Sequence, residues 1–171
     1  ARYRLPWLLV CLAGTQLSSV VLIYASREVG LYDRLSVFTA AIMAMSGNAS
    51  LQSATTTVRR LALDTLPRKR FFQHVAREVS VALLMGAVCG AFAGALASVF
   101  GHNPLIGFSL GLAMAVGMSA ASLLGAAMPL ILDLFKIDPA VASGPLVSTI
   151  NDSLALAVYF TVATVILISF G

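Results

Sequence analysis

The chain has 171 residues, of which 59% are hydrophobic and 11% are charged, and its mean hydropathy is +0.94. Because soluble domains carry about a quarter charged residues, this composition excludes a soluble domain, as well as a disordered tail, a nucleic-acid-binding arm and a disulfide-rich miniprotein. The net charge of +4 fits a membrane protein with basic loops on one side. We therefore expect a polytopic membrane protein that binds no nucleic acid.

Five apolar stretches are long enough to cross a bilayer, which takes about 20 residues in a helix. They cover residues 6–26, 35–58, 79–100, 104–132 and 145–170, and the only charged residue among them is Asp152. The first stretch is too long for a signal peptide and lacks a small-residue cleavage site. The sequence thus predicts an all-α integral membrane protein, in which residues 1–171 form a single domain of five transmembrane helices. The chain opens with Ala1 directly before a span, which is typical of a piece of a longer protein.

The basic residues predict the orientation of these spans. Arg27 and Arg34 fall on one side of the membrane. The other nine of the eleven Lys and Arg residues fall on the opposite side: Arg2, Arg4, Arg59, Arg60, Arg68, Lys69, Arg70, Arg77 and Lys136. Positive residues concentrate in the cytoplasm, so we expect the N-terminus inside and the C-terminus outside. The cluster at 68–70 also predicts contact with anionic lipid headgroups.

Small residues recur at every fourth position of the third span, where they let a neighbouring helix approach closely. The stripe comprises Gly86, Gly90, Gly94 and Ser98, and a similar one begins in the fourth span at Gly107 and Gly111. Packing within one bundle is the expected role of both stripes. Pro129 is expected to kink the fourth span or to mark its end.

The two histidines, His74 and His102, lie in predicted loops, and neither has a partner at metal-ligand spacing. We expect both to be surface residues.

Two spans carry polar residues on one helix face each. In the second span these are Asn48, Gln52, Thr55 and Thr56, and in the fifth they are Pro145, Ser148, Thr149 and Asp152. Counting the helical rise from the predicted span ends places both patches at about the same depth. A carboxylate at membrane depth is costly and usually marks an ion or substrate pathway.

Every donor in these patches is an oxygen or an amide, which suits Mg²⁺, Ca²⁺ or Mn²⁺ better than Zn²⁺ or Cu⁺. One carboxylate is little charge for a divalent ion, whereas two chains on a two-fold axis supply two. The alternative is that Asp152 is protonated, or is bonded to Asn48 or Thr149 and only holds helices together.

Two segments resemble the MgtE family of magnesium channels. SGNASLQSAT (46–55) looks like that family's GGNxGxQ stretch, and IDPAVASGPLVSTINDSLALAVYF (137–160) is very close to its last-span signature. The resemblance covers essentially the whole chain as a transmembrane domain. It implies a homodimer in the cell membrane, with one pore on the dimer axis lined by spans two and five. The family's pore aspartate falls on Asp152.

The resemblance and the polar faces together predict the ion site. The expected ion-contacting residues are Asp152, Gly47, Asn48, Ser148, Thr55 and Ala44, and the expected pore-lining residues are Gln52, Thr149 and Pro145.

The chain departs from the family pattern at four positions. Ser46, Ser50 and Ala44 stand where glycine is usual, and Leu51 stands where asparagine can occur. We therefore expect Mg²⁺ to be the main ion, with Mn²⁺, Co²⁺ or Ca²⁺ tolerated to varying degrees. Many family members also have a cytoplasmic N-terminal domain and paired CBS domains. This chain has neither, so either a regulatory domain is separate or removed, or gating differs.

Functions other than ion conduction would each require particular residues. The membrane spans carry no catalytic carboxylate pair, no Ser with a His base and no His pair, so we expect no enzyme and no catalytic residues. The same residues are equally consistent with an ion-coupled divalent-cation exchanger or exporter and with a channel. A non-transporting assembly subunit is the third alternative.

Overall fold

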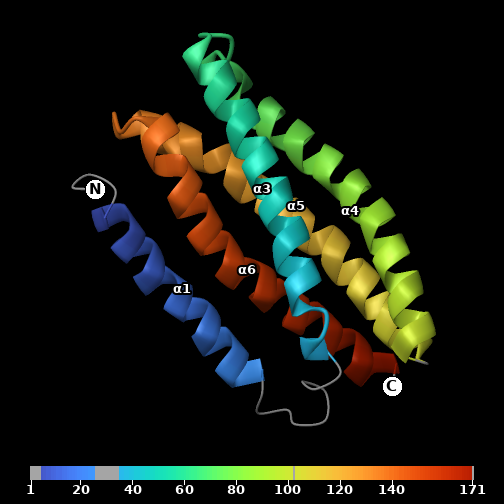
Figure 1. Cartoon of the computed structure of the whole chain (residues 1–171). Helices are drawn as coiled ribbons and strands as arrows, with labels where there is room; N and C mark the ends of the chain where they lie inside the picture. The colour runs from blue at the N-terminus through green and yellow to red at the C-terminus, as the bar shows by residue number, and fades with distance from the viewer. Residues whose placement is uncertain (1–4, 26–34, 102, 171) are drawn as a thin grey trace.

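The computed structural model describes residues 5–25, 35–101 and 103–170, apart from the side chains of residues 5–8, 10, 68, 101, 140–143 and 145. These ranges contain five α-helices and no strand, which confirms the all-α prediction. The elements are α1 (Leu5–Ala25), α3 (Thr39–Ala62), the 3-10 helix η1 (Arg68–Arg70), α4 (Phe71–Gly101), α5 (Pro104–Leu134) and α6 (Pro139–Phe170). Figure 1 shows them as one bundle of long, inclined helices.

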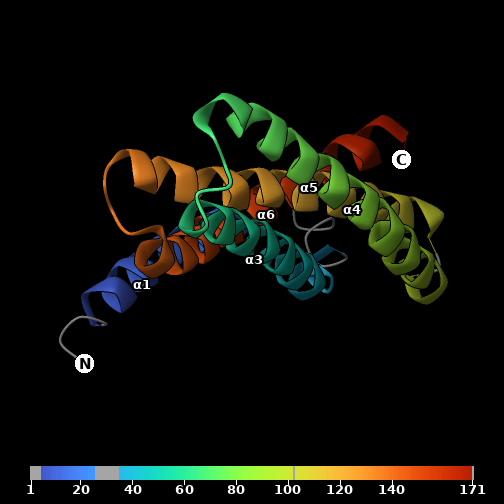
Figure 2. The ribbon, with the colours of Figure 1, turned by 90° about the horizontal axis from the view of Figure 1, so that it is seen from above.

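Helix α5 is the centre of the bundle and contacts α3, α4 and α6. Helix α1 packs mainly along α6, so α1 and α4 lie at opposite edges (Figures 1 and 2). The main core lies between α3, α5 and α6 and includes Leu110, Met114, Leu156 and Tyr159. The buried Tyr159 hydroxyl donates to the Leu35 carbonyl at 2.9 Å, which ties α6 to the segment before α3.

Local chemistry explains where the helices begin and end. Asn103 caps α5, since its side chain accepts a hydrogen bond from the Leu105 amide at 2.9 Å and Pro104 occupies the first helical position. Asp64 and Lys136 follow α3 and α5 with φ of 51° and 58°. A left-handed residue at this point lets the last carbonyls of a helix find donors beyond it.

The glycine stripe of the third predicted span packs against α5. A Cβ atom built at Gly90 would overlap the Gly111 backbone, and one at Gly94 would overlap the Gly107 backbone. The two helices therefore touch backbone to backbone, as the small residues predicted.

Among the described residues, three helices are long and apolar enough to cross a membrane: Phe71–Phe100, Pro104–Leu134 and Leu146–Phe170. The described apolar part of α1, Cys11–Ala25, is shorter. Helix α3 has 24 residues, or about 36 Å of helix, but many of its side chains are polar. The start of α1, the α3–α4 connection and the α5–α6 turn lie at one end of the bundle (Figure 1).

Several helices begin or end away from the expected boundaries: α3 is shifted to 39–62, and α6 begins at Pro139, six residues before the predicted span. Helix α4 begins at Phe71, eight residues before the predicted span, because residues 71–78 form an amphipathic extension. Pro129 is buried inside α5, which continues to Leu134, so of the two expected roles, a kink or a helix end, the helix end is excluded. A proline forfeits one backbone hydrogen bond, and the packing of a long buried helix outweighs that loss.

Candidate functional site

Helix α3 presents two different polar faces. The buried face carries small residues that recur at helical spacing, namely Ser46, Ala49, Ser50, Ser53, Ala54 and Thr57. Ser53 and Ser122 of α5 share a hydrogen bond of 2.6 Å, and a Cβ atom at Gly125 would overlap the Ser50 backbone. This face of α3 therefore packs closely on α5, with Ser53 bonded across the interface.

The opposite face of α3 forms an open groove. Its lining consists of Asn48, Leu51, Gln52, Thr55, Thr56, Arg59, Arg60 and Leu63. The four polar residues that the spacing placed on one face thus share one surface. The Thr55 and Thr56 hydroxyls donate to the Leu51 and Gln52 carbonyls at 2.8 and 2.9 Å. Each hydroxyl hydrogen is used within the helix, so the oxygen lone pairs remain free to accept or to bind a cation.

Asp152 lies on the neighbouring helix α6 and is half-buried, as is Ser148 one turn before it. Within the part of the chain that the structure describes, the Asp152 carboxyl group forms no hydrogen bond or ion pair, and so none with Asn48 or Thr149. It does not line the α3 groove. The structure therefore leaves the one carboxylate of the predicted spans without a bonding partner in the protomer.

Asn151 of α6 lies beside α3 and was missed by the sequence analysis, which singled out only its neighbour Asp152. Its side chain is fully buried, and a Cβ atom built at Gly47 of α3 would lie 3.9 Å from its Nδ2 atom. Both amide atoms of Asn151 and the Ser46 hydroxyl are buried with no hydrogen-bond partner among the described residues. The sequence does contain a signal for Asn151, because a side-chain amide inside an apolar span is unusual.

The remaining predicted site residues differ in how far they are exposed and in which helix they face. Ala44 is exposed on α3, one turn before Asn48, and Gly47 is half-buried toward α6. Thr149 is buried, and its methyl group lies where a Cβ atom of Gly14 in α1 would be, so it occupies a helix contact. The Pro145 side chain lies outside the described part of the structure.

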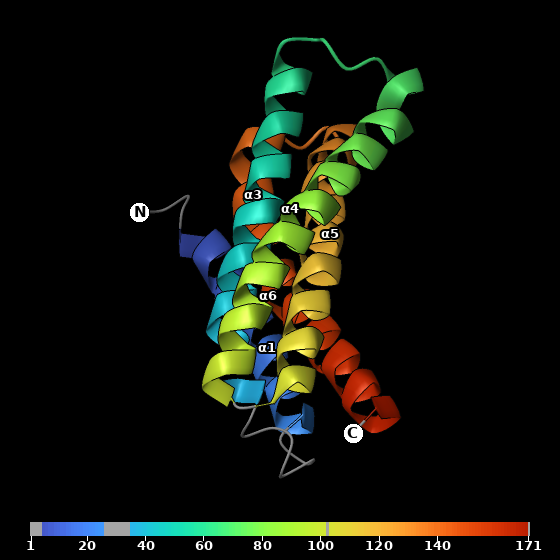
Figure 3. The same cartoon turned by 90° about the vertical axis from the view of Figure 1, so that its right-hand side faces the viewer.

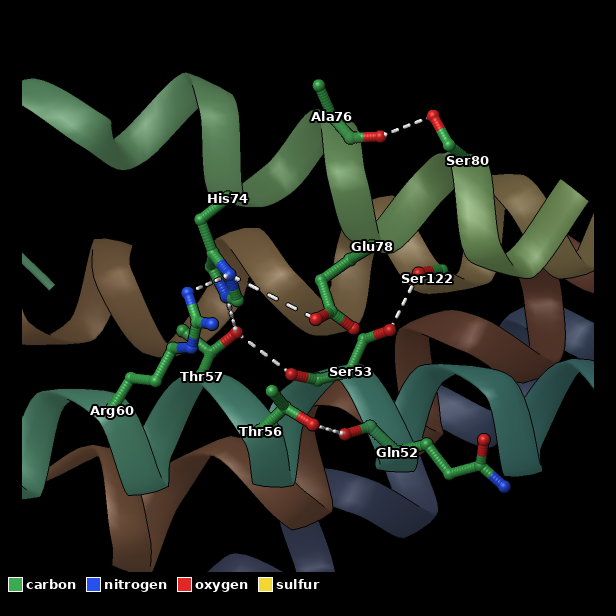
Figure 4. Close-up of polar contacts among 10 residues, drawn as sticks. All are labelled: Gln52, Ser53, Thr56, Thr57, Arg60, His74, Ala76, Glu78, Ser80 and Ser122. Carbon is green, nitrogen blue, oxygen red and sulfur yellow. Dashed lines mark hydrogen bonds and ion pairs between the residues drawn. The ribbon is translucent and has the colours of Figure 1, made fainter. Parts of the chain in front are cut away.

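His74 is buried, so the expectation of a surface histidine was wrong. It lies in the helical extension of α4, whose apolar face packs on α5 through Val75. Its Nε2 atom is 2.8 Å from the Thr57 hydroxyl, and its Nδ1 atom is 3.3 Å from the Arg60 guanidinium (Figure 4). His102 lies outside the described residues.

These contacts define the state of the His74 ring. The Thr57 hydroxyl donates its only hydrogen to the Ser53 carbonyl at 2.8 Å, so it accepts from Nε2. Arg60 can only donate, so Nδ1 accepts. The ring is therefore neutral, carries its hydrogen on Nε2, and holds the Arg60 guanidinium in place.

Comparison with known proteins identifies the family. The sequence profile of the MgtE family, described as a divalent cation transporter, matches residues 39–162. The chain belongs to the MgtE family. It is therefore a multi-pass protein of the cell membrane, as its apolar helices indicate.

Three similar proteins are each named magnesium transporter MgtE. The protein from Enterococcus faecalis is 36% identical over 165 residues, that from Bacillus subtilis 31% over 161, and that from Thermus thermophilus 28% over 164. These matches cover 94–96% of this chain but 36% of each relative. The chain thus corresponds to about a third of the length of these MgtE proteins.

Proposed function

We propose that this chain forms the membrane domain of a Mg²⁺ channel or transporter, with a pore at a homodimer axis between α3 and α6 of two protomers. The observation that carries this proposal is the exposed polar face of α3. Asn48, Gln52, Thr55 and Thr56 are all exposed in the protomer, in a helix that belongs to a membrane protein.

The rest of the bundle shows what a lipid-facing surface looks like in this protein. The exposed side chains of α4 are apolar, including Leu83, Leu84, Val88, Phe92 and Val99. Amides facing lipid would lose their hydrogen bonds to water at a cost of several kcal/mol each. The α3 groove is therefore expected to face water or another protein chain.

The part of the groove that carries Asn48, Gln52, Thr55 and Thr56 offers oxygen ligands, which suit a hydrated divalent ion. The described residues contain no group of three or more His, Cys, Asp or Glu that could hold a metal ion. Mg²⁺ loses its water reluctantly and is usually bound through one or two carboxylates with several waters retained. Two copies of Asp152 facing a two-fold axis would supply that charge, with Gly47, Asn48, Thr55, Ser148 and Ala44 nearby.

The proposed topology places all five helices across the membrane as a single domain, with the N-terminus in the cytoplasm. The described basic residues of the α3–α4 connection and Lys136 lie at one end of the bundle, together with the start of α1. Entry of a divalent ion then gains about 4.6 kcal/mol per 100 mV of negative-inside potential, since each charge gains about 2.3 kcal/mol.

Flux measurements test this proposal. Purified protein in liposomes should carry Mg²⁺ down its gradient, with Mn²⁺, Co²⁺ and Ca²⁺ carried to smaller extents. A channel should conduct with no second ion present, whereas a coupled exchanger should require one. Absence of flux under both conditions would favour an assembly subunit and would contradict the proposal.

A further inference from the structure

A second polar pocket, at the end of the bundle where α3 connects to α4, has no role in the proposed ion site. Its lining consists of Arg60, Thr65, Leu66, Pro67, Arg70, Gln73, His74 and Arg77. These residues come from the end of α3, the connecting segment, η1 and the first turns of α4. Figure 3 shows this connection at the end of the bundle. The pocket has a volume of about 450 Å³, which is within the usual range for small-ligand sites.

The pocket concentrates positive charge without a counter-charge. Arg60, Arg70 and Arg77 all line it, and no carboxylate does. Among the described residues, the guanidinium groups of Arg70 and Arg77 form no ion pair. Cations that converge in this way repel one another unless an anion lies between them.

The nearby carboxylates face elsewhere. Glu78 lies 4.0 Å from His74 Nδ1, the same atom that faces Arg60, but it does not line the pocket. Asp64 and Asp133 line a separate pocket on the opposite side of the same connection. The pocket lining thus carries three guanidinium groups and no carboxylate.

The donors of the pocket are partly held in position. The Arg60 guanidinium donates to the buried His74, as described above, which restricts its motion. Gln73 and Arg77 are four residues apart on α4 and therefore share one helix face. The Thr65 hydroxyl donates to the Arg60 carbonyl at 3.2 Å, which ties the connecting segment to the end of α3.

We infer that this pocket binds a phosphate group. Guanidinium forks match the paired oxygens of phosphate, and three of them with one amide donor can satisfy its acceptors. Basic pockets at the cytoplasmic end of transmembrane helices bind the headgroups of anionic lipids. The phosphate can therefore belong to a lipid headgroup or to a soluble phosphate compound. Because Arg60 also lines the α3 groove, the bound anion would offset positive charge beside that groove.

Binding measurements on the purified full chain test this inference without any transport assay. One arm adds phosphatidylglycerol or, as a neutral control lipid without a phosphate group, diacylglycerol to protein in detergent, and native mass spectrometry counts retained lipids. The other arm titrates inorganic phosphate or pyrophosphate, with sodium chloride at matched ionic strength, and follows thermal unfolding.

The test variant is Arg70→Gln combined with Arg77→Gln. Its matched control is Arg59→Gln combined with Lys136→Gln, which removes the same charge from two exposed residues outside the pocket. The wild type and the control should bind phosphatidylglycerol, phosphate or both, and the test variant should bind at least tenfold more weakly. Retention of the lipid alone would assign the site to a headgroup, and binding of phosphate or pyrophosphate alone would assign it to a soluble ligand.

A second variant covers the case in which the double variant does not fold. Gln73→Glu places a carboxylate in the pocket at an exposed position and should also weaken binding at least tenfold. Equal weakening in the control and the test variants would show diffuse electrostatic attraction and would overturn the inference. So would binding of neither phosphate source, or equal retention of the neutral lipid. Because no arm measures flux, a failure here is separate from a failure of the proposed ion pore.

Discussion

Replacing Asp152 by asparagine is the most direct perturbation of the proposed pore. The substitution keeps the size of the side chain and its ability to accept hydrogen bonds, but removes the charge. Because the carboxyl group has no bonding partner among the described residues, its replacement should not loosen the bundle. The folded state should remain as stable as in the wild type, or become more stable, since burying an unpaired charge is costly.

The expected size of the effect follows from the half-buried position of Asp152. If one water separates the carboxylate from Mg²⁺, the two lie about 4 Å apart. At that distance in bulk water two unit charges attract by about 1 kcal/mol, so a divalent ion gains about 2 kcal/mol per carboxylate. That energy corresponds to roughly 30-fold in affinity, and two copies on a dimer axis give roughly 1,000-fold.

The assay is Mg²⁺ uptake by liposomes, with Asp133→Asn as the matched control at an exposed residue beyond the proposed pore. Asp152→Asn should lower uptake at least 30-fold, and the control should not change it. In parallel, Mg²⁺ at 100 times its Kd should stabilise the wild type by about 2.7 kcal/mol and should not stabilise the Asp152 variant. Wild-type uptake by the Asp152 variant, or an equal loss in the control, would refute the reasoning.

Three further predictions concern assembly, selectivity and packing. In a cysteine-free background, Thr55→Cys in the α3 groove should form crosslinked dimers in membranes, whereas Leu84→Cys on the exposed face of α4 should not; the reverse pattern would exclude the proposed interface. Leu51→Asn adds a polar contact to the groove and should raise the ratio of Mg²⁺ to Ca²⁺ flux, so an unchanged ratio would show that this residue does not affect selection. In a melting assay, Gly90→Leu should lower the free energy of unfolding by about 3 kcal/mol or more, because its Cβ atom would overlap the α5 backbone. In the same assay, Ala91→Leu on the exposed face of α4 should change the free energy of unfolding by less than about 0.5 kcal/mol.

The double polar character of α3 illustrates a limit of sequence patterns. Serine and threonine at helical spacing indicated a polar helix, and both faces of that helix carry hydroxyl groups. Only packing against α5 and α6 shows that Ser46, Ser50 and Ser53 are buried, while Thr55 and Thr56 are exposed in the groove. The pattern does not distinguish them because a serine that joins helices and a threonine that faces water have the same local preferences.

The sequence by itself determined the class of protein, the helical architecture and the family, because apolar runs of about 20 residues and a specific last-span signature are local properties. It also placed the polar residues of α3 on one face, since helical periodicity requires no knowledge of neighbouring helices. Burial of His74, the contact of Asn151 with Gly47 and the basic pocket at the α3–α4 connection were decided by the tertiary structure alone. Each depends on which helices pack together and on where the connection between them folds. Those choices come from long-range contacts that no stretch of the chain encodes within itself.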